Sequence, residues 1–258
     1  MSVVFAQISD CHLKAQPDAL HYGANVYQNL LLALRKIKQD KNIEFLIFTG
    51  DLTQDHTAES YQLFNQAFLE TQLVIPVYYL AGNHDDWAML DEYLTAPCFN
   101  PAKTIELNTW QIHLLDSKSQ TPAGYIAPSQ LARIEVLDDK RFHFLLTHHH
   151  SVDVNYFIDR HGLENQTQLW QALDNKKHIK GMSCGHVHRA MELPLPSGFS
   201  HPFALYSCPA TSVTFERDPD NLIALHHSVG YRTFTLTSQG NIDTQVVELS
   251  GNKNKATM

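Results

Sequence analysis

The sequence is poor in cysteine, and its cysteines are not arranged in pairs. The 258 residues include four cysteines, none of them in a Cys-x-x-Cys motif: Cys11, Cys98, Cys184 and Cys208. Four thiols are too few to staple a chain of this length, which argues against a disulfide-rich secreted protein. We therefore expect a reducing compartment, most simply the cytoplasm.

Positive charge is also scarce. The chain has 19 lysines and arginines against 27 aspartates and glutamates, so its net charge is −8 with histidine neutral. Non-specific binding to DNA or RNA needs a basic surface, and no stripe of lysine and arginine is present. We expect no nucleic-acid partner. Charged residues make up 18% and hydrophobic residues 43% of the chain, which is typical of a folded globular protein.

Long apolar runs are missing as well. The first run, Val3–Ile8, meets Ser9 and Asp10 at once, so we expect no signal peptide. The longest stretch without Asp, Glu, Lys or Arg spans residues 193–215 and contains four prolines. Prolines at this density are incompatible with a helix that spans lipid, and we expect no membrane association.

Short apolar runs alternate with helical patterns in the first half of the chain. Val3–Ile8, Phe45–Phe48 and Val74–Leu80 are predicted as buried strands, with helices between them. This order favours a parallel sheet covered by helices. From Phe203 onward, β-branched and aromatic residues predict a mainly antiparallel sheet. No linker or repeat divides the chain, so we expect one domain over residues 1–251 and a flexible tail over residues 252–258.

Histidine is abundant, with 16 copies, and polar clusters follow five of the predicted strands. The clusters are Asp10-Cys11-His12, Gly50-Asp51, Gly82-Asn83-His84-Asp85, His148-His149-His150 and Gly185-His186-Val187-His188. Because ligands bind beyond the carboxyl ends of parallel strands, we expect these clusters to share one rim.

The spacing within two of the clusters suits metal binding. In an extended chain, residues two apart face the same side, so Asp10 and His12 can converge. The same argument applies to His186 and His188. Carboxylate, amide and imidazole donors suit Mn, Fe or Zn, and no cysteine is needed as a ligand. Each cluster alone also fits a tight turn or a helix cap, but such an interpretation does not explain the order of all five.

That ordered set resembles the calcineurin-like metallophosphoesterase superfamily over nearly the whole chain. Within the superfamily, the sequence is similar to the class III cyclic-nucleotide phosphodiesterases, the branch of the bacterial cAMP phosphodiesterases. The narrower resemblance rests on residues 8–13, 49–55, 114–117, 159–165, 208–212 and 230–233. The resemblance implies an α/β fold, a sandwich of two mixed β-sheets flanked by helices, with the site at the strand ends.

The resemblance also implies two metal ions, either iron, manganese or zinc. Asp10, His12 and His188 would hold the first ion, and Asn83, His148 and His186 the second, with Asp51 bridging both. Such ions lie about 3.5–4 Å apart and generate a hydroxide that attacks phosphorus. His84 matches the catalytic histidine of the family, which contacts the substrate phosphate beside Asn83. A group that titrates near neutrality suits protonation of the leaving oxygen.

Several assignments stay open at this point. The family commonly has proline soon after the histidines of its fourth motif, whereas Ser151 follows here, so His149 is an alternative to His148. Asp55 has no assigned role, and Asp85 is typical of a loop or helix cap. Residues 159–165 either line the substrate mouth or form a surface hairpin.

The expected activity is hydrolysis of 3′,5′-cyclic nucleotides, cAMP first, to 5′-monophosphates. Two divalent ions, two aspartates, one hydroxide and a monoanionic diester together carry no net charge, which favours a diester over a dianionic monoester. One alternative is a broader phosphodiesterase or pyrophosphatase on other small phosphate esters. Another is a non-catalytic scaffold, which the complete ligand set argues against. The sequence carries no signal of oligomeric state.

Overall fold

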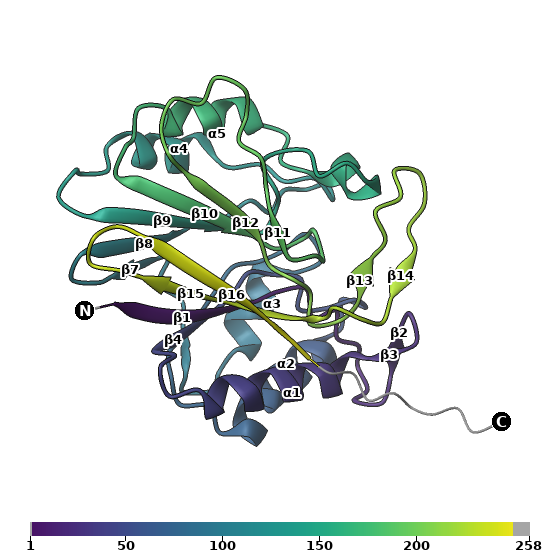
Figure 1. The fold of residues 1–258 in the computed structure, drawn as a ribbon. Coiled ribbons are helices and arrows are strands. Elements are labelled where there is room, and N and C mark those ends of the chain that lie inside the picture. Colours follow the sequence, from purple (N-terminus) through teal and green to yellow (C-terminus); the bar gives the residue numbers. More distant parts are fainter. Residues whose placement is uncertain (1, 250–258) are drawn as a thin grey trace.

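The computed structural model describes residues 2–249, and the predicted tail at residues 252–258 lies outside them. Two β-sheets lie face to face, and helices cover the outer face of each (Figure 1). The predicted fold class is therefore confirmed. Among the described residues, no helix has both the length and the apolar character needed to span a bilayer.

The first sheet contains the three strands predicted near the N-terminus. Its order is β16 (Ile242–Glu248), β15 (Gly230–Leu236), β1 (Val3–Ile8), β4 (Phe45–Phe48), β5 (Val77–Tyr79) and β6 (Phe99–Asn100). Strands β1, β4, β5 and β6 are parallel, and β15 and β16 add antiparallel pairs at one edge. The helices α1 (Val26–Gln39), α2 (Ala58–Thr71) and α3 (Trp87–Tyr93) cover its outer face (Figure 1).

The second sheet is built from the later part of the chain. Its order is β11 (Met191–Glu192), β12 (Ala204–Ser207), β10 (Ile179–Cys184), β9 (Phe142–Thr147), β8 (Trp110–Leu114) and β7 (Thr104–Glu106). Its four central strands are parallel. The helices α4 (Pro128–Glu135) and α5 (Gln166–Leu173) cover its outer face, and a short 3-10 helix, η1 (Phe157–His161), lies near the strand ends (Figure 1).

An apolar layer joins the two sheets. Phe5 and Phe234 of the first sheet and Phe144 of the second are fully buried, and their ring centroids lie 5.0–5.9 Å apart. Burial of such a side chain stabilises the fold by about 1.5–3 kcal/mol. The layer fixes one sheet against the other, and so brings the carboxyl ends of β1 and β4 close to those of β9 and β10.

Two small hairpins lie beyond these strand ends. One pairs β2 (Leu20–His21) with β3 (Ala24–Asn25), and the other pairs β13 (Thr214–Phe215) with β14 (Ala224–Leu225). Figure 1 shows both at the same side of the sandwich. A Cβ at Gly23 would lie 3.4 Å from the His226 ring, so the first hairpin reaches the chain just after the second.

The strands from Phe203 onward pair mainly antiparallel, as predicted, but the prediction that they form one sheet is wrong. Strand β12 joins the second sheet, parallel to β10, whereas β15 and β16 join the first sheet. Apolar β-rich segments show that strands form, but they do not specify the partner. The pairing is decided by which strand edges remain free once the two layers have formed.

Candidate active site

The five predicted clusters meet where the two sheets face each other. Three follow β1, β4 and β5 of the first sheet, and two follow β9 and β10 of the second. The side chains with carboxylate or imidazole donors are all buried, with no more than 4% of their surface exposed: Asp10, His12, Asp51, His148, His186 and His188. Asn83 is partly exposed. The predicted single rim is thus formed by two sheets instead of one.

The backbone at this rim is strained. Five of the candidate ligands have a positive φ between 47° and 64°: Asp10, His12, Asp51, His186 and His188. Residues with a side chain rarely adopt this region, and the cost is about 1–3 kcal/mol each. The expectation that Asp10 and His12 converge from an extended chain is therefore wrong. These residues converge because left-handed turns aim their side chains inward.

The first group of donors is Asp10, His12 and His188, whose donor atoms all lie within 4.8 Å of one another. The Nε2 atoms of His12 and His188 are 3.1 Å apart, and His188 Nε2 lies 3.5 Å from Asp10 Oδ1. His188 Nδ1 donates to the Val213 carbonyl at 2.8 Å. That bond fixes the ring and leaves the Nε2 lone pair of a neutral imidazole directed at the group, as in metal-binding histidines.

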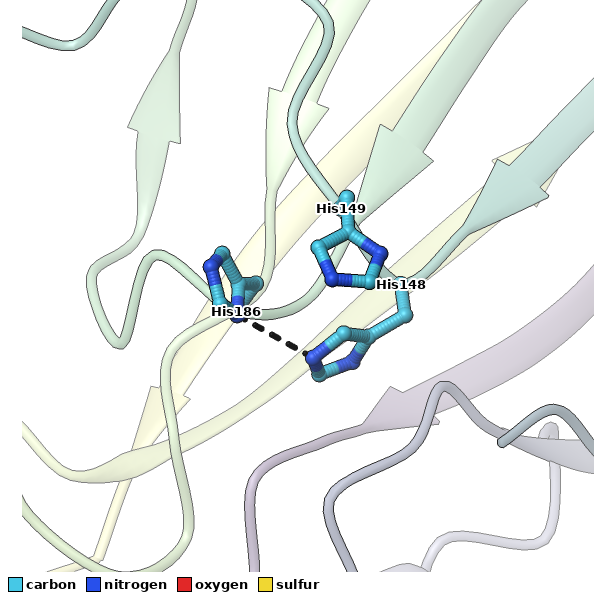
Figure 2. Close-up of side chains that lie close together, drawn as sticks. All are labelled: His148, His149 and His186. Atoms are coloured by element: carbon cyan, nitrogen blue, oxygen red, sulfur yellow. Dashed lines mark hydrogen bonds between the residues drawn. The ribbon is translucent and has the colours of Figure 1, made fainter. Parts of the chain in front are cut away.

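The second group is formed around His148. Its Nε2 lies 3.1 Å from Asn83 Oδ1 and 3.2 Å from His186 Nδ1, and its Nδ1 donates to the Thr49 carbonyl at 2.7 Å. Figure 2 shows this contact between one nitrogen of each ring, and the rings of His148 and His186 meet edge to face. His186 and His188 therefore belong to different groups, although they are only two residues apart.

Asp51 lies between the two groups. Its Oδ2 is 3.4 Å from His148 Nε2 and 3.6 Å from His12 Nε2, and its Oδ1 accepts the backbone N–H of His84 at 2.9 Å. A Cβ at Gly82 would collide with the Asp51 carboxylate, so this approach requires glycine. One carboxylate thus contacts both halves of the site.

Asp85 holds the turn that carries Asp51. Its carboxylate accepts backbone N–H groups of Asp51, Leu52 and Gly82, each at 2.8 Å. The next residue, Asp86, caps α3 by accepting from Met89 N at 3.1 Å. The typical role of a cap therefore falls one residue later than the sequence indicates, and Asp85 joins the loops after β4 and β5.

Burial controls the protonation of the histidines. It lowers the pKa of His188 to about 3 and the pKa values of His12 and His186 well below the ordinary value. These three imidazoles are neutral at neutral pH, which is the form that binds metal.

The carboxylates behave differently. Burial raises the pKa of Asp10 to about 7. Burial also opposes ionisation of Asp51, but His148 outweighs it and holds the pKa of Asp51 well below its ordinary value. Burial would lower the pKa of His148, yet the Asp51 charge raises it to about 9. A divalent cation here would favour ionised Asp10 and displace the His148 proton.

The donor set fits metal ions. The imidazole nitrogens that face the site, His12 Nε2 and His186 Nδ1, lie 3.1 Å and 3.2 Å from nitrogens of other candidate ligands, His188 and His148. Oxygen and imidazole donors suit Mn, Fe or Zn. Cys11 and Cys184, next to the ligands in sequence, are buried and lie against Thr211 and the Tyr206 carbonyl. The donor set therefore needs no thiolate.

His149 is close to the second group but is otherwise engaged. Its Nδ1 lies 2.8 Å from Ser117 Oγ and its Nε2 lies 3.1 Å from the Pro122 carbonyl. Although the donor atoms of His148, His149 and His186 lie within 4.8 Å of one another, both nitrogens of His149 have partners in the loop after β8. This geometry favours His148 over His149 as a ligand.

We expect His148→Ala to lose metal and His149→Ala to keep it, because His148 Nε2 lies 3.4 Å from Asp51 Oδ2 whereas both nitrogens of His149 are bonded elsewhere. Elemental analysis of each metal-reconstituted variant measures the ions per chain. Loss of metal in His149→Ala with His148→Ala unaffected would move the ligand by one residue.

His84 lies beside the groups and lines a cavity of about 760 Å³. Its ring packs edge-on against His12, with centroids 5.0 Å apart, and stacks on His56 at 5.5 Å. His56 Nδ1 bonds the His84 carbonyl at 2.9 Å. Burial lowers the pKa of His84, so a neutral ring faces the cavity at neutral pH.

The sequence does not single out several residues of this cavity, among them His21, His56 and Lys118. Lys118 Nζ donates to the Asn83 carbonyl at 3.1 Å, which puts a cation beside the predicted phosphate contacts. The position of Lys118 shortly after the strand that ends at Leu114 could have predicted it, because the other clusters also follow strand ends.

Of the residues whose roles the sequence left unassigned, all but one hold the local backbone through hydrogen bonds. Asp55 accepts from Ala15 N at 2.7 Å and from Thr57 Oγ1 at 2.8 Å, in the turn before α2. Asp159 accepts two backbone N–H groups of the loop at residues 154–155, and Asn165 pairs with the backbone of Ile126. Only His161 of this segment lines the cavity, from η1 and not from a hairpin.

Comparison with known proteins gives consistent matches. The profile of the family described as Calcineurin-like phosphoesterase matches residues 3–203. A protein of Colwellia psychrerythraea named "Probable cyclic nucleotide phosphodiesterase" is 45% identical over 96% of this chain and 95% of its own length. The "3′,5′-cyclic adenosine monophosphate phosphodiesterase CpdA" of Escherichia coli is 31% identical over 95% of this chain and 89% of its own.

Solved structures show the same fold. A dimetal phosphatase from Danio rerio superposes with a TM-score of 0.62 over 96% of this chain and 99% of its own, at 11% identity. A purple acid phosphatase from yellow lupin superposes with a TM-score of 0.61 over 96% of this chain and 54% of its own, at 13% identity.

Proposed function

We propose a mechanism by which this chain, which belongs to the calcineurin-like phosphoesterase family, hydrolyses 3′,5′-cyclic nucleotides. The protein is a metal-dependent phosphoric diester hydrolase, a cyclic-nucleotide phosphodiesterase. Our proposal adds cAMP as the preferred substrate and 5′-AMP as the product. Metal-dependent hydrolysis is supported by the position of Asp51 between two groups of buried donors beside an open cavity.

We assign the ligands as follows. Asp10, His12 and His188 would hold one ion, and Asn83, His148 and His186 the other, with Asp51 shared between the two groups. Iron, manganese or zinc would suit donors that are carboxylate, amide and imidazole. When bound, they supply polarisation of the phosphoryl oxygens and a lowered pKa of bound water.

The other residues act on the substrate. Lys118 and the Asn83 amide lie beside the place where the phosphate binds. The negative charge of a bound phosphodiester favours the protonated form of His84, which gives its proton to O3′ as the bond between O3′ and phosphorus breaks. Water oxygen forms the new bond to phosphorus, and the proton that this water loses replaces the one that His84 gave. Asp85 acts through Asp51 by fixing the turn that carries it. The 5′-phosphate is the product because the bond to O5′ is kept.

The domain organisation, location and partner are proposed from the sequence and the state of the cysteines. We propose a single catalytic domain over residues 1–251 and a location in the cytoplasm, where the four cysteines stay unpaired, as they are here. The partner is a small phosphodiester. A net charge of −8 disfavours nucleic acid as a partner.

A substrate panel tests this function. With Mn or Fe, we expect hydrolysis of 3′,5′-cAMP and of bis-p-nitrophenyl phosphate. We expect slower hydrolysis of the monoester p-nitrophenyl phosphate and no cleavage of double-stranded DNA. The monoester is slower because its second charge is not balanced in the site. Chromatography that separates 5′-AMP from 3′-AMP identifies the product, and 2′,3′-cAMP and cGMP complete the panel. Activity on the chromogenic diester without hydrolysis of any cyclic nucleotide would indicate a broader phosphodiesterase instead.

A further inference from the structure

One part of the cavity wall is apolar and has no role in the chemistry described above. Tyr22 and Leu222 are 49% and 45% exposed, and Phe157 and Phe215 lie beside them in the lining. These four residues form what we call the aromatic shelf. Two of them belong to the hairpins β2–β3 and β13–β14, and Leu222 lies in the loop of the second. We propose that the aromatic shelf binds the adenine base of the substrate, an inference that rests on the proposed function.

The shelf is continuous with the metal ligands. The Phe215 ring stacks on His188 at a centroid distance of 4.2 Å, and the Tyr22 ring meets Phe215 edge-on at 6.3 Å. Tyr22 also contacts His21 at 4.5 Å, and His21 stacks on His12 at 5.1 Å. Two chains of ring contacts thus lead from the first donor group to Tyr22. A nucleotide whose phosphate lies at the donors has its base within reach of this shelf.

The backbone at Tyr22 gives an independent indication. Tyr22 and Gly23 are the central residues of the β2–β3 turn, with φ of +46° and +82°. A two-residue turn with positive φ at both positions is the type I′ hairpin, which favours Asn-Gly. A bulky ring at the first position is an outlier in this conformation. Folding alone would be better served by asparagine, so the ring has another purpose.

The chemistry of the shelf suits a nucleobase. Every base has a flat π face, and stacking on aromatic side chains contributes binding that does not depend on hydrogen bonds. Tyr22 and Leu222 line the cavity and are nearly half exposed, and a base placed against them would cover part of that surface. Contacts of this kind are the same in the bound substrate and in the transition state, so they affect KM and not kcat.

The test combines a change in the enzyme with a change in the substrate. Tyr22→Asn removes the ring and suits the turn, and Leu222→Ser removes the second apolar contact. The substrates are 3′,5′-cAMP and the 3′,5′-cyclic phosphate of 1-O-methylribose, which has no base. We expect KM for cAMP to rise by roughly 10-fold in each variant, with kcat within about twofold of wild type. KM for the base-free diester stays unchanged, since a missing base cannot lose a contact.

Controls separate this role from a structural one. Thermal unfolding of Tyr22→Asn should give a Tm equal to or above that of wild type. Leu69→Ser changes a leucine of similar exposure, 47%, on α2, and should leave both KM values unchanged.

Two results would overturn the proposal, and they are distinguishable from failure of the proposed function. An unchanged KM for cAMP in both variants would show that the aromatic shelf does not bind the base, and the proposed hydrolysis of cAMP would be unaffected. An equal rise for both substrates would show that Tyr22 supports the site and not the base. A wild-type protein that does not hydrolyse cAMP would remove the proposed substrate, and the shelf with it.

Discussion

Asp51→Ala is expected to remove most of the bound metal and to lower cAMP hydrolysis by roughly 10³-fold or more. The carboxylate lies close to both donor groups, 3.4 Å from His148 Nε2 and 3.6 Å from His12 Nε2. Its loss therefore weakens the binding of both ions. Metal ions contribute several kcal/mol to stabilising the charge of such a transition state, and each 1.36 kcal/mol is a factor of ten in rate.

Metal content and turnover are measured on the same reconstituted sample of the Asp51 variant. Asp139→Ala serves as the control, because it removes an exposed carboxylate of the loop after α4. Two retained ions per chain in Asp51→Ala would show that this carboxylate does not bridge the groups.

His84→Ala is expected to keep its metal and to lower kcat by roughly 10²–10⁴-fold, the usual contribution of a general acid or base. The imidazole lines the cavity with a ring nitrogen within 4.8 Å of donor atoms of His12 and Asp51, but the hydrogen bond from His84 to Asp51 is made by the backbone N–H at 2.9 Å. Alanine keeps that backbone bond, so Asp51 stays in place. Only the group that protonates O3′ is removed.

Elemental analysis and steady-state kinetics separate the two roles of His84. His227→Ala, which changes an exposed histidine, should match wild type in both measurements. If His84→Ala lost metal as fully as Asp51→Ala, His84 would be a ligand and not the proton donor.

The order of the motifs predicted that the five polar clusters lie close together, and the structure brings them together. Polar residues at the carboxyl ends of parallel strands in one sheet share an edge, which is why Asp10 and Asp51 lie together. His148 joins them from β9 of the second sheet, which faces the first. The sandwich also followed, because the family resemblance specifies its layers.

Other features could not be read from the sequence because they depend on tertiary contacts. The left-handed backbone at His186 and His188 is uncommon for any residue with a side chain, so the sequence does not predict it at these two positions. That His149 bonds Ser117 and Pro122 depends on a loop from another strand. The parallel pairing of β12 with β10 likewise depends on which edge is free.

The most direct test of the account is a metal titration of metal-free protein with 3′,5′-cAMP as substrate. Mn²⁺ is added in steps, and the rate of 5′-AMP formation is recorded with the metal bound per chain. The account predicts no turnover without metal and a rate that stops rising at two ions per chain. Full activity at one ion per chain, or turnover of cAMP in the presence of excess chelator, would contradict it.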